Sequence, residues 1–199
     1  MHAIKDAADM QDPATSPFTR WVEEAERLDV AVYAAIARTP TPTLDRAMSR
    51  LSGAADYSRL SLASAAVLAL TGGRTGHRAA VIGLASVAVA ATVANLIAKP
   101  LGRRRRPDRI AQEVPLARQV RMPVSSSFPS GHAAAAFAFA TGVAHVSPEA
   151  AAPLSVLAAL VAYSRVHTGV HYPGDVVAGS LLGAALAAAT ARALDGRLP

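Results

Sequence analysis

The sequence predicts an all-α membrane helical bundle with about five to six transmembrane helices and an N-terminal amphipathic helix. Two observations lead to this prediction. Hydrophobic residues make up 52% of the 199 positions but aromatic residues only 5%, and alanine dominates the apolar runs. Alanine-rich helices bury little area per residue and pack closely, as membrane helices do. Several apolar stretches of nearly spanning length also follow one another, which is rare in water-soluble folds.

The N-terminal segment is polar and divides into a tail and a helix. Residues 1–19 are expected to be a disordered tail, because prolines and small polar residues interrupt any periodicity. Residues 20–38 carry apolar side chains at spacings of three and four beside a charged face, which predicts an amphipathic helix at the membrane interface. With its proline-rich linker this unit covers residues 20–42. No cleavable signal peptide is predicted, since no basic n-region precedes an apolar h-region.

Residues 43–195 form the expected membrane-embedded domain. A short helix at about 43–53 opens it. Five apolar stretches follow, at about 57–71, 78–98, 131–146, 150–166 and 175–194. A helix needs roughly 17–25 residues to cross a bilayer, so the first and third stretches require their polar flanks for the crossing. The alternative is a water-soluble protein built from alanine-rich helices.

The order of these stretches predicts which loops share a face. Two spans separate the loop at 99–130 from the loop at 167–175, and two spans return the chain to its starting side. Both loops are therefore expected at one membrane face. The loops at 72–77 and 147–149 are expected at the other.

Charge and cysteine content narrow the classes of function. The net charge is +6, divided into −4 for residues 1–29 and +10 for the remainder, with most of the excess in residues 99–121. Such a loop could bind nucleic acid, anionic lipid or a phosphorylated substrate. One short arginine run without aromatic platforms gives little support to nucleic acid. The chain has no cysteine, which excludes disulfides, thiolate metal sites and cysteine nucleophiles.

Three cations lie where a predicted span meets a loop: Lys99, Arg106 and Arg165. Charge at the centre of a bilayer costs roughly 2.5–3.5 kcal/mol per residue on insertion scales, so such residues usually face a polar cavity. Three converging cations suit a group with two negative charges, and arginine adds bidentate geometry for phosphate oxygens. We interpret the neighbouring Arg103–Arg105 mainly as a membrane anchor or a contact to anionic lipid.

The sequence Pro129-Ser130-Gly131-His132 comes directly before an alanine-rich stretch. Ser130 is a plausible N-cap, and Gly131 lets the backbone approach a ligand closely. Free N–H groups and the positive end of the helix dipole bind phosphate at such a terminus. His132, in the first turn, would then lie beside the phosphate.

His167, His171 and Asp175 are spaced by four residues. On an unbroken helix they would form one metal-binding face, and this alternative stays open. We expect Pro173 and Gly174 to interrupt the helix and a turn to bring Asp175 back onto His171. A carboxylate bonded to one imidazole nitrogen leaves the other nitrogen free as a nucleophile. His167 is then a structural loop residue.

Together the three clusters resemble the signature of the type 2 phosphatidic acid phosphatase superfamily, in its bacterial membrane branch. That signature reads K-x6-RP, PSGH and SR-x5-H-x3-D, and the chain matches every fixed position over roughly residues 43–195. The resemblance implies that His171 attacks phosphorus, that Asp175 orients it, and that His132 protonates the leaving group and then activates water. It also implies phosphate binding by Lys99, Arg106, Ser130, Gly131 and Arg165. Neither a metal ion nor another cofactor is implied.

The expected function is that of an integral-membrane lipid phosphatase acting through a phosphohistidine. Candidate substrates are phosphatidic acid, phosphatidylglycerophosphate and polyprenyl phosphates or diphosphates. The alternatives are a vanadium-dependent haloperoxidase-like enzyme and a non-catalytic protein that binds anionic lipid. We expect a multi-pass protein of the cell membrane with its site on the extracytoplasmic face, by analogy with relatives that act on cell-wall carrier lipids. The positive-inside rule favours the cytoplasm instead. Gly179 and Gly183 either leave room for a lipid tail or, as we prefer, allow close helix packing.

Overall fold

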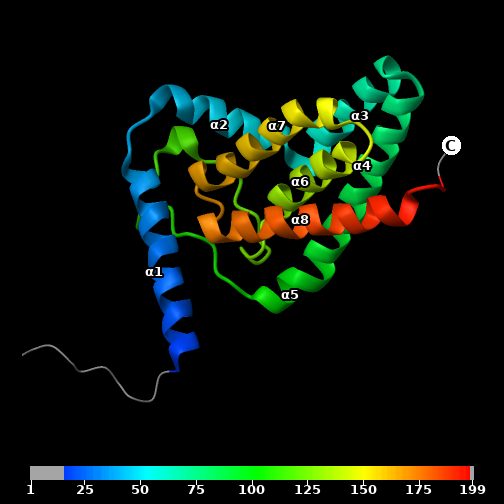
Figure 1. Cartoon of the computed structure of the whole chain (residues 1–199). Coiled ribbons are helices and arrows are strands. Elements are labelled where there is room, and N and C mark those ends of the chain that lie inside the picture. The colour runs from blue at the N-terminus through cyan, green and yellow to red at the C-terminus, as the bar shows by residue number, and fades with distance from the viewer. Residues whose placement is uncertain (1–15, 198–199) are drawn as a thin grey trace, which may run out of the picture.

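The computed structural model describes residues 16–197, and in this range it contains helices and loops but no strand. The α-helices are α1 (Pro17–Arg38), α2 (Pro42–Ala54), α3 (Arg59–Thr71), α4 (Gly73–Val93), α5 (Lys99–Gly102), α6 (Gly131–Ala144), α7 (Pro148–His167) and α8 (Pro173–Leu194) (Figure 1). A π-helical turn, Ala94–Ala98, joins α4 to α5. Short 3₁₀ turns lie at Asp56–Ser58 and Leu116–Arg118. Residues 1–15 of the predicted tail lie outside the described range.

Proline and polar caps set where the helices begin. Proline occupies the first turn of α1, α2, α7 and α8. Its missing N–H costs nothing there, because the first N–H groups of a helix have no partner within the helix. Ser16 caps α1 and Ser130 caps α6, each by accepting from an N–H three residues later. The amphipathic helix therefore begins at Pro17, slightly before its predicted start.

Helix α6 is the centre of the bundle and packs against α4, α7 and α8 (Figure 1). Small side chains allow these backbones to approach closely. A Cβ atom placed on Gly183 of α8 would overlap the carbonyl group of Ala134 on α6, and one on Gly179 would overlap the backbone of Ser130. Of the two readings of these glycines, close helix packing is therefore the correct one.

Three segments among the described residues are long and apolar enough to cross a membrane: Gly73–Gly102, Pro148–His167 and Pro173–Leu194. The other two predicted stretches form α3 and α6, with 13 and 14 residues. They are short because α3 follows a tight turn and α6 begins inside the bundle at the capped Ser130. The predicted membrane helical bundle is confirmed, and three of its segments have full spanning length.

The two ends of the bundle carry different groups of loops. At one end, Arg106 Nη1 donates to the Val170 carbonyl at 2.7 Å, which joins the loop at 99–130 to the loop at 167–175. At the other end, Asp195 after α8 lies 2.8 Å from Arg78 of α4 and 3.7 Å from His145 after α6. The two signature loops therefore meet at one end of the bundle, as the prediction of a shared face requires.

A buried arginine attaches α1 and α2 to the signature end. Arg118 has no exposed surface, and its Nε donates to Asp45 Oδ1 at 2.8 Å. Its other nitrogens donate to carbonyls at the end of α1, those of Ile36, Ala37 and Thr39. His167 Nε2 lies 2.9 Å from the same Asp45 oxygen. His167 is therefore structural as predicted, but it is the last residue of α7 rather than part of a loop.

Candidate active site

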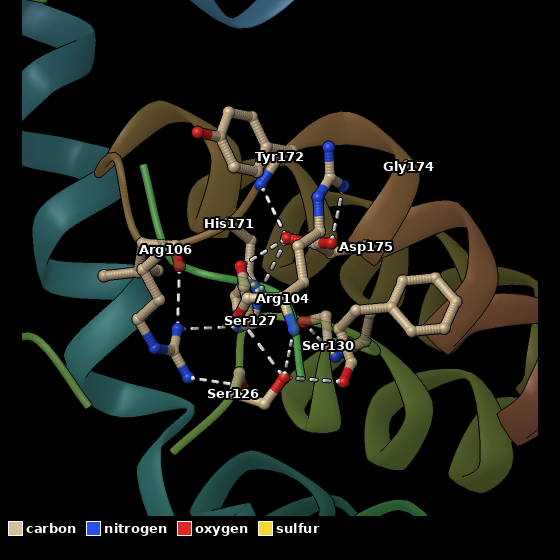
Figure 2. A network of polar contacts seen from close by, with 12 residues as sticks. Arg104, Arg106, Ser126, Ser127, Ser130, His171, Tyr172, Gly174 and Asp175 are labelled. Carbon is tan, nitrogen blue, oxygen red and sulfur yellow. Dashed lines mark hydrogen bonds and ion pairs between the residues drawn. The ribbon is translucent and has the colours of Figure 1, made fainter. Parts of the chain in front are cut away.

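His171 lies at the centre of the signature cluster, in the connection between α7 and α8 (Figure 2). The predicted helix break was placed too late. Helix α7 already ends at His167, Gly169 adopts the left-handed conformation with φ +70°, and Pro173 begins α8 instead of interrupting a helix. Asp175 lies in the first turn of α8, where it accepts from Tyr172 N at 2.9 Å. This cap, rather than a turn after a broken helix, brings Asp175 onto His171.

The two nitrogens of His171 face different partners. Nδ1 lies 3.5 Å from Asp175 Oδ2, and Ser127 Oγ donates to the same carboxylate oxygen at 2.5 Å. Nε2 lies 3.3 Å from Arg106 Nη1, which can only donate. This network assigns the proton to Nδ1 and the lone pair to Nε2.

Burial keeps His171 uncharged. The side chain is 2% exposed, and desolvation, assisted by the charge of Arg106, lowers its pKa to about 4 against the opposing effect of Asp175. The imidazole is therefore neutral near pH 7.

Polar groups hold Arg106 beside His171 and Lys99 beside the start of α6. Arg106 donates through Nε to the Ser125 carbonyl at 2.9 Å and through Nη2 to the Ser126 carbonyl at 3.2 Å. Lys99 Nζ donates to Asn95 Oδ1 at 2.8 Å, and a Cβ on Gly131 would lie 3.4 Å from this ammonium group. The ammonium group thus lies over the first residue of α6, whose free N–H groups form an anion site.

Arg165 and His132 complete the cluster. Arg165 is 2% exposed and donates through Nη1 to Ser52 Oγ at 2.6 Å. Within residues 16–197 its buried Nε has no hydrogen-bond partner, so this donor is available for a ligand oxygen. His132 lines a cavity of about 200 Å³ together with Lys99 and Gly131. All eight predicted site residues therefore lie at one end of the bundle, around the N-terminus of α6.

Residues 79–198 match the model of the PAP2 superfamily. The chain belongs to this superfamily. It is 47% identical over 62 residues to an undecaprenyl-diphosphatase of Sulfolobus acidocaldarius, covering 31% of this chain and 30% of the relative. It is 43% identical over 101 residues to a decaprenylphosphoryl-5-phosphoribose phosphatase of Mycobacterium tuberculosis, covering 50% and 52%. The chain thus matches about a third and about half of the length of these relatives.

Two solved structures have the same fold over most of their length. LpxE of Aquifex aeolicus superimposes with a TM-score of 0.67 at 23% identity, covering 83% of this chain and 95% of that one. A transmembrane PAP2-type phosphatidylglycerolphosphate phosphatase of Bacillus subtilis gives 0.66 at 24% identity, covering 88% of each. The arrangement of helices in this chain is therefore the PAP2 membrane fold.

Arg104 is a site residue that the sequence analysis interpreted wrongly. Its Nη1 donates to Asp29 Oδ2 at 2.7 Å and to Asp175 Oδ1 at 2.8 Å, and its Cζ lies 4.2 Å from the ring centre of Tyr172 (Figure 2). Asp29, on α1, also accepts from Gly174 N at 2.6 Å. Arg104 thus binds Asp175 and is not a membrane anchor. The sequence carries no signal for this role, because Asp29 is distant along the chain.

The sequence analysis missed two further residues, which lie near His171 and His132. Ser127 donates to Asp175, and its place two residues before the PSGH motif was a weak signal. Asp56, between α2 and α3, has a carboxylate oxygen 2.9 Å from His132 Nε2. No pattern in the sequence connects Asp56 with His132, because only the packing of the Asp56–Ser58 turn against α6 brings them together.

The metal-binding alternative is not supported. His167 turns to Asp45 at 2.9 Å, away from His171 and Asp175. Over residues 16–197, no group of three or more His, Cys, Asp or Glu side chains could hold a metal ion. His167, His171 and Asp175 are therefore equally spaced in the sequence but do not form one metal site.

Proposed function

We propose that this chain is an integral-membrane PAP2 phosphatase that hydrolyses a lipid phosphomonoester or diphosphate through a phosphohistidine at His171. The observation that carries the proposal is the neutral, buried His171, with Nδ1 beside Asp175 and Nε2 beside the Arg106 guanidinium. A nucleophile needs a lone pair that is not protonated, and a nearby positive charge stabilises the negative charge of the phosphate that it attacks. Nε2 carries such a lone pair, and Arg106 supplies the positive charge.

The reaction proceeds in two displacements. Nε2 of His171 attacks phosphorus, the bond to the lipid oxygen breaks, and His132 gives that oxygen a proton. Water then attacks the phosphohistidine with His132 as the base, which releases phosphate and regenerates His171. Lys99, Arg106 and the free Nε of Arg165 stabilise the transferred group, together with the Gly131 N–H at the start of α6. Ser130, whose own N–H donates to the Asp175 carbonyl at 2.9 Å, caps the helix that presents this group.

The same cations support a reaction without a metal ion. Phosphoryl transfer depends mainly on positioning and on charge stabilisation, which metal ions supply in many other enzymes. Here Lys99, Arg106 and Arg165 supply three positive charges at the signature end of the bundle, close enough for the charges of the two arginines to act on Lys99. Turnover should therefore persist in a chelator, and loss of activity on chelation would contradict this part of the proposal.

Two observations support a lipid substrate of the polyprenyl class. The 200 Å³ cavity extends from Lys99 and His132 to apolar side chains of α3, α6 and α7: Leu60, Ala135, Ala136 and Val161. The two curated relatives are named for undecaprenyl and decaprenyl lipids. Phosphatidic acid and phosphatidylglycerophosphate remain the comparison substrates. The partners we expect are this lipid and the membrane, with no nucleic acid.

We further propose a multi-pass protein of the cell membrane with its site on the extracytoplasmic face. The positive-inside rule weighs against this face only if the loop arginines are free. Arg104 and Arg118 bind carboxylates, and Arg109 donates to the carbonyls of Val120 and Gly169. These cations are used within the fold, which weakens the rule. Exposed Phe18 and Trp21 on α1 support the interfacial position proposed for residues 20–42.

The decisive experiment compares the wild-type protein with His171→Asn on a panel of lipid phosphates, with His145→Asn at the opposite end of the bundle as control. We expect His171→Asn to abolish phosphate release and His145→Asn to retain it. Acid-labile phosphate should be trapped on the wild-type chain only. Unchanged turnover in His171→Asn would refute the mechanism, and halide oxidation that depends on added vanadate would favour the haloperoxidase-like alternative.

A further inference from the structure

A carboxylate outside the PAP2 signature lies beside the residue that we propose as the acid and base. Asp56 Oδ1 is 2.9 Å from His132 Nε2 and 3.9 Å from Arg165 Nη1. Its side chain is 46% exposed, so it faces open space rather than the core. The two histidines of the proposed mechanism thus each have a carboxylate partner, His171 with Asp175 and His132 with Asp56, and only Asp175 belongs to the signature.

The backbone that presents Asp56 is strained. Tyr57 and Ser58 follow it with φ of 56° and 55°. This left-handed conformation is unfavourable for residues other than glycine. Strain of this kind persists only where the surrounding structure imposes it, and it gathers at functional sites. Asp56 and Tyr57 line a hollow of about 420 Å³ with His132, Arg165 and Ser125.

The position of Asp56 relative to the reacting phosphorus follows from the proposed mechanism. His171 attacks from one side, and in phosphoryl transfer the leaving oxygen departs roughly in line on the opposite side. His132 must reach that leaving oxygen in order to protonate it. Because Asp56 contacts His132, its carboxylate lies on the leaving-group side of the phosphate site.

We propose that Asp56 positions His132 and makes the site select phosphomonoesters, whose leaving group is an alkoxide, over lipid diphosphates, whose leaving group is a phosphate anion. This inference rests on the proposed function. With either substrate, the bond from phosphorus to the leaving oxygen breaks and a bond to His171 Nε2 forms. Asp56 changes only which of the two substrates reacts faster.

Two effects of the carboxylate favour the monoester. An alkoxide cannot depart without a proton, and Asp56 stabilises the protonated His132 that supplies it. A phosphate leaving group is already a stable anion near neutral pH and needs little help. Its negative charge would also lie close to Asp56 and be repelled, whereas hydroxyl groups on a neutral head group could donate to the carboxylate.

The test uses two substrates with the same tail, farnesyl phosphate and farnesyl diphosphate, with the full chain purified in detergent. Wild-type protein should have the higher kcat/KM for the monophosphate. In Asp56→Asn we expect this value to fall about 100-fold, the usual size of general acid catalysis, while the value for the diphosphate changes less than about threefold. Asp56→Glu should retain the preference for the monophosphate, and Asp195→Asn at the opposite end should change neither value. An equal fall for both substrates, or no change, would overturn the role of Asp56.

A binding measurement tests the same idea without turnover. Thermal stabilisation by inorganic phosphate should exceed that by pyrophosphate in the wild type, and this difference should shrink in Asp56→Asn. An unchanged difference would overturn the selectivity. The two proposals fail in different ways. Activity retained in His171→Asn would refute the phosphohistidine mechanism, whereas an inactive His171→Asn combined with an unaltered substrate ratio in Asp56→Asn would refute only the role of Asp56.

Discussion

Replacing Arg104 by methionine removes a cation that two carboxylates share. Arg104 Nη1 lies 2.7 Å from Asp29 Oδ2 and 2.8 Å from Asp175 Oδ1, and Asp175 has no exposed surface. Methionine keeps much of the length and apolar contact of the side chain but cannot pair with either carboxylate. Asp29 on α1 and Asp175 on α8 would then face each other without compensation.

The size of the effect follows from this geometry. Two carboxylates about 5 Å apart repel by roughly 3 kcal/mol at the effective dielectric constant of about 20 that suits partly buried sites. A loss of this size should lower the unfolding temperature of a chain of this length by about 6–12 °C. Turnover should fall tenfold or more, because Asp175 is no longer held in register with His171. It should not vanish, since Ser127 and the Tyr172 N–H still bind Asp175.

The assay is thermal unfolding in detergent, followed by phosphate release at a temperature where every variant is folded. Arg105→Met is the matched control, because Arg105 is the next residue and is exposed. Adding Asp29→Asn to Arg104→Met removes one of the two facing charges and should recover part of the stability. If Arg104→Met unfolds and turns over like Arg105→Met, Arg104 does not hold Asp175.

Three further predictions concern packing, protonation and orientation. Gly183→Ala should lower the unfolding temperature by several degrees because its Cβ overlaps the α6 backbone, whereas Gly53→Ala, with no atom within 4 Å of the new Cβ, should not. The imidazole of His171 should stay neutral above pH 4 and gain its second proton only as the pH falls through about 4, because burial lowers its pKa. The measurement is the pH titration of the histidine NMR signal that disappears in His171→Asn. A titration near pH 6.5 would contradict the prediction. A cysteine at the exposed Leu116 should react with an impermeant thiol reagent from outside intact cells, and one at Thr75 should not; the reverse result would place the site in the cytoplasm.

Much of the fold could be predicted from the apolar stretches and from the prolines and glycines that lie between them. The five apolar stretches form α3, α4, α6, α7 and α8, and prolines mark the starts of α7 and α8. What periodicity could not fix was the exact point at which a helix ends. Helix α7 ends at His167 because Gly169 takes a left-handed conformation, a choice that depends on contacts such as the Arg109 donation to its carbonyl.

The candidate site divides in a similar way. Lys99, Arg106, His132 and His171 stand at fixed spacings on chain segments that the order of spans brings to one end of the bundle, so their proximity follows from the sequence. The arginine run shows where this reasoning stops. Four adjacent arginines look alike in sequence, yet Arg104 binds Asp29 and Asp175, Arg106 binds loop carbonyls beside His171, and Arg105 is exposed.

The sequence by itself determined the helical membrane class and the meeting of the two signature loops at one end of the bundle, and it predicted the phosphate chemistry of their residues. Each of these depends on spacing along the chain and on residue type. Only the tertiary structure decided which carboxylate serves which cation or histidine: Asp29 with Arg104, Asp45 with Arg118 and His167, and Asp56 with His132. The physical reason is that an ion pair depends on distance in space. These partners lie many residues apart and meet only when α1 and α2 pack against the bundle.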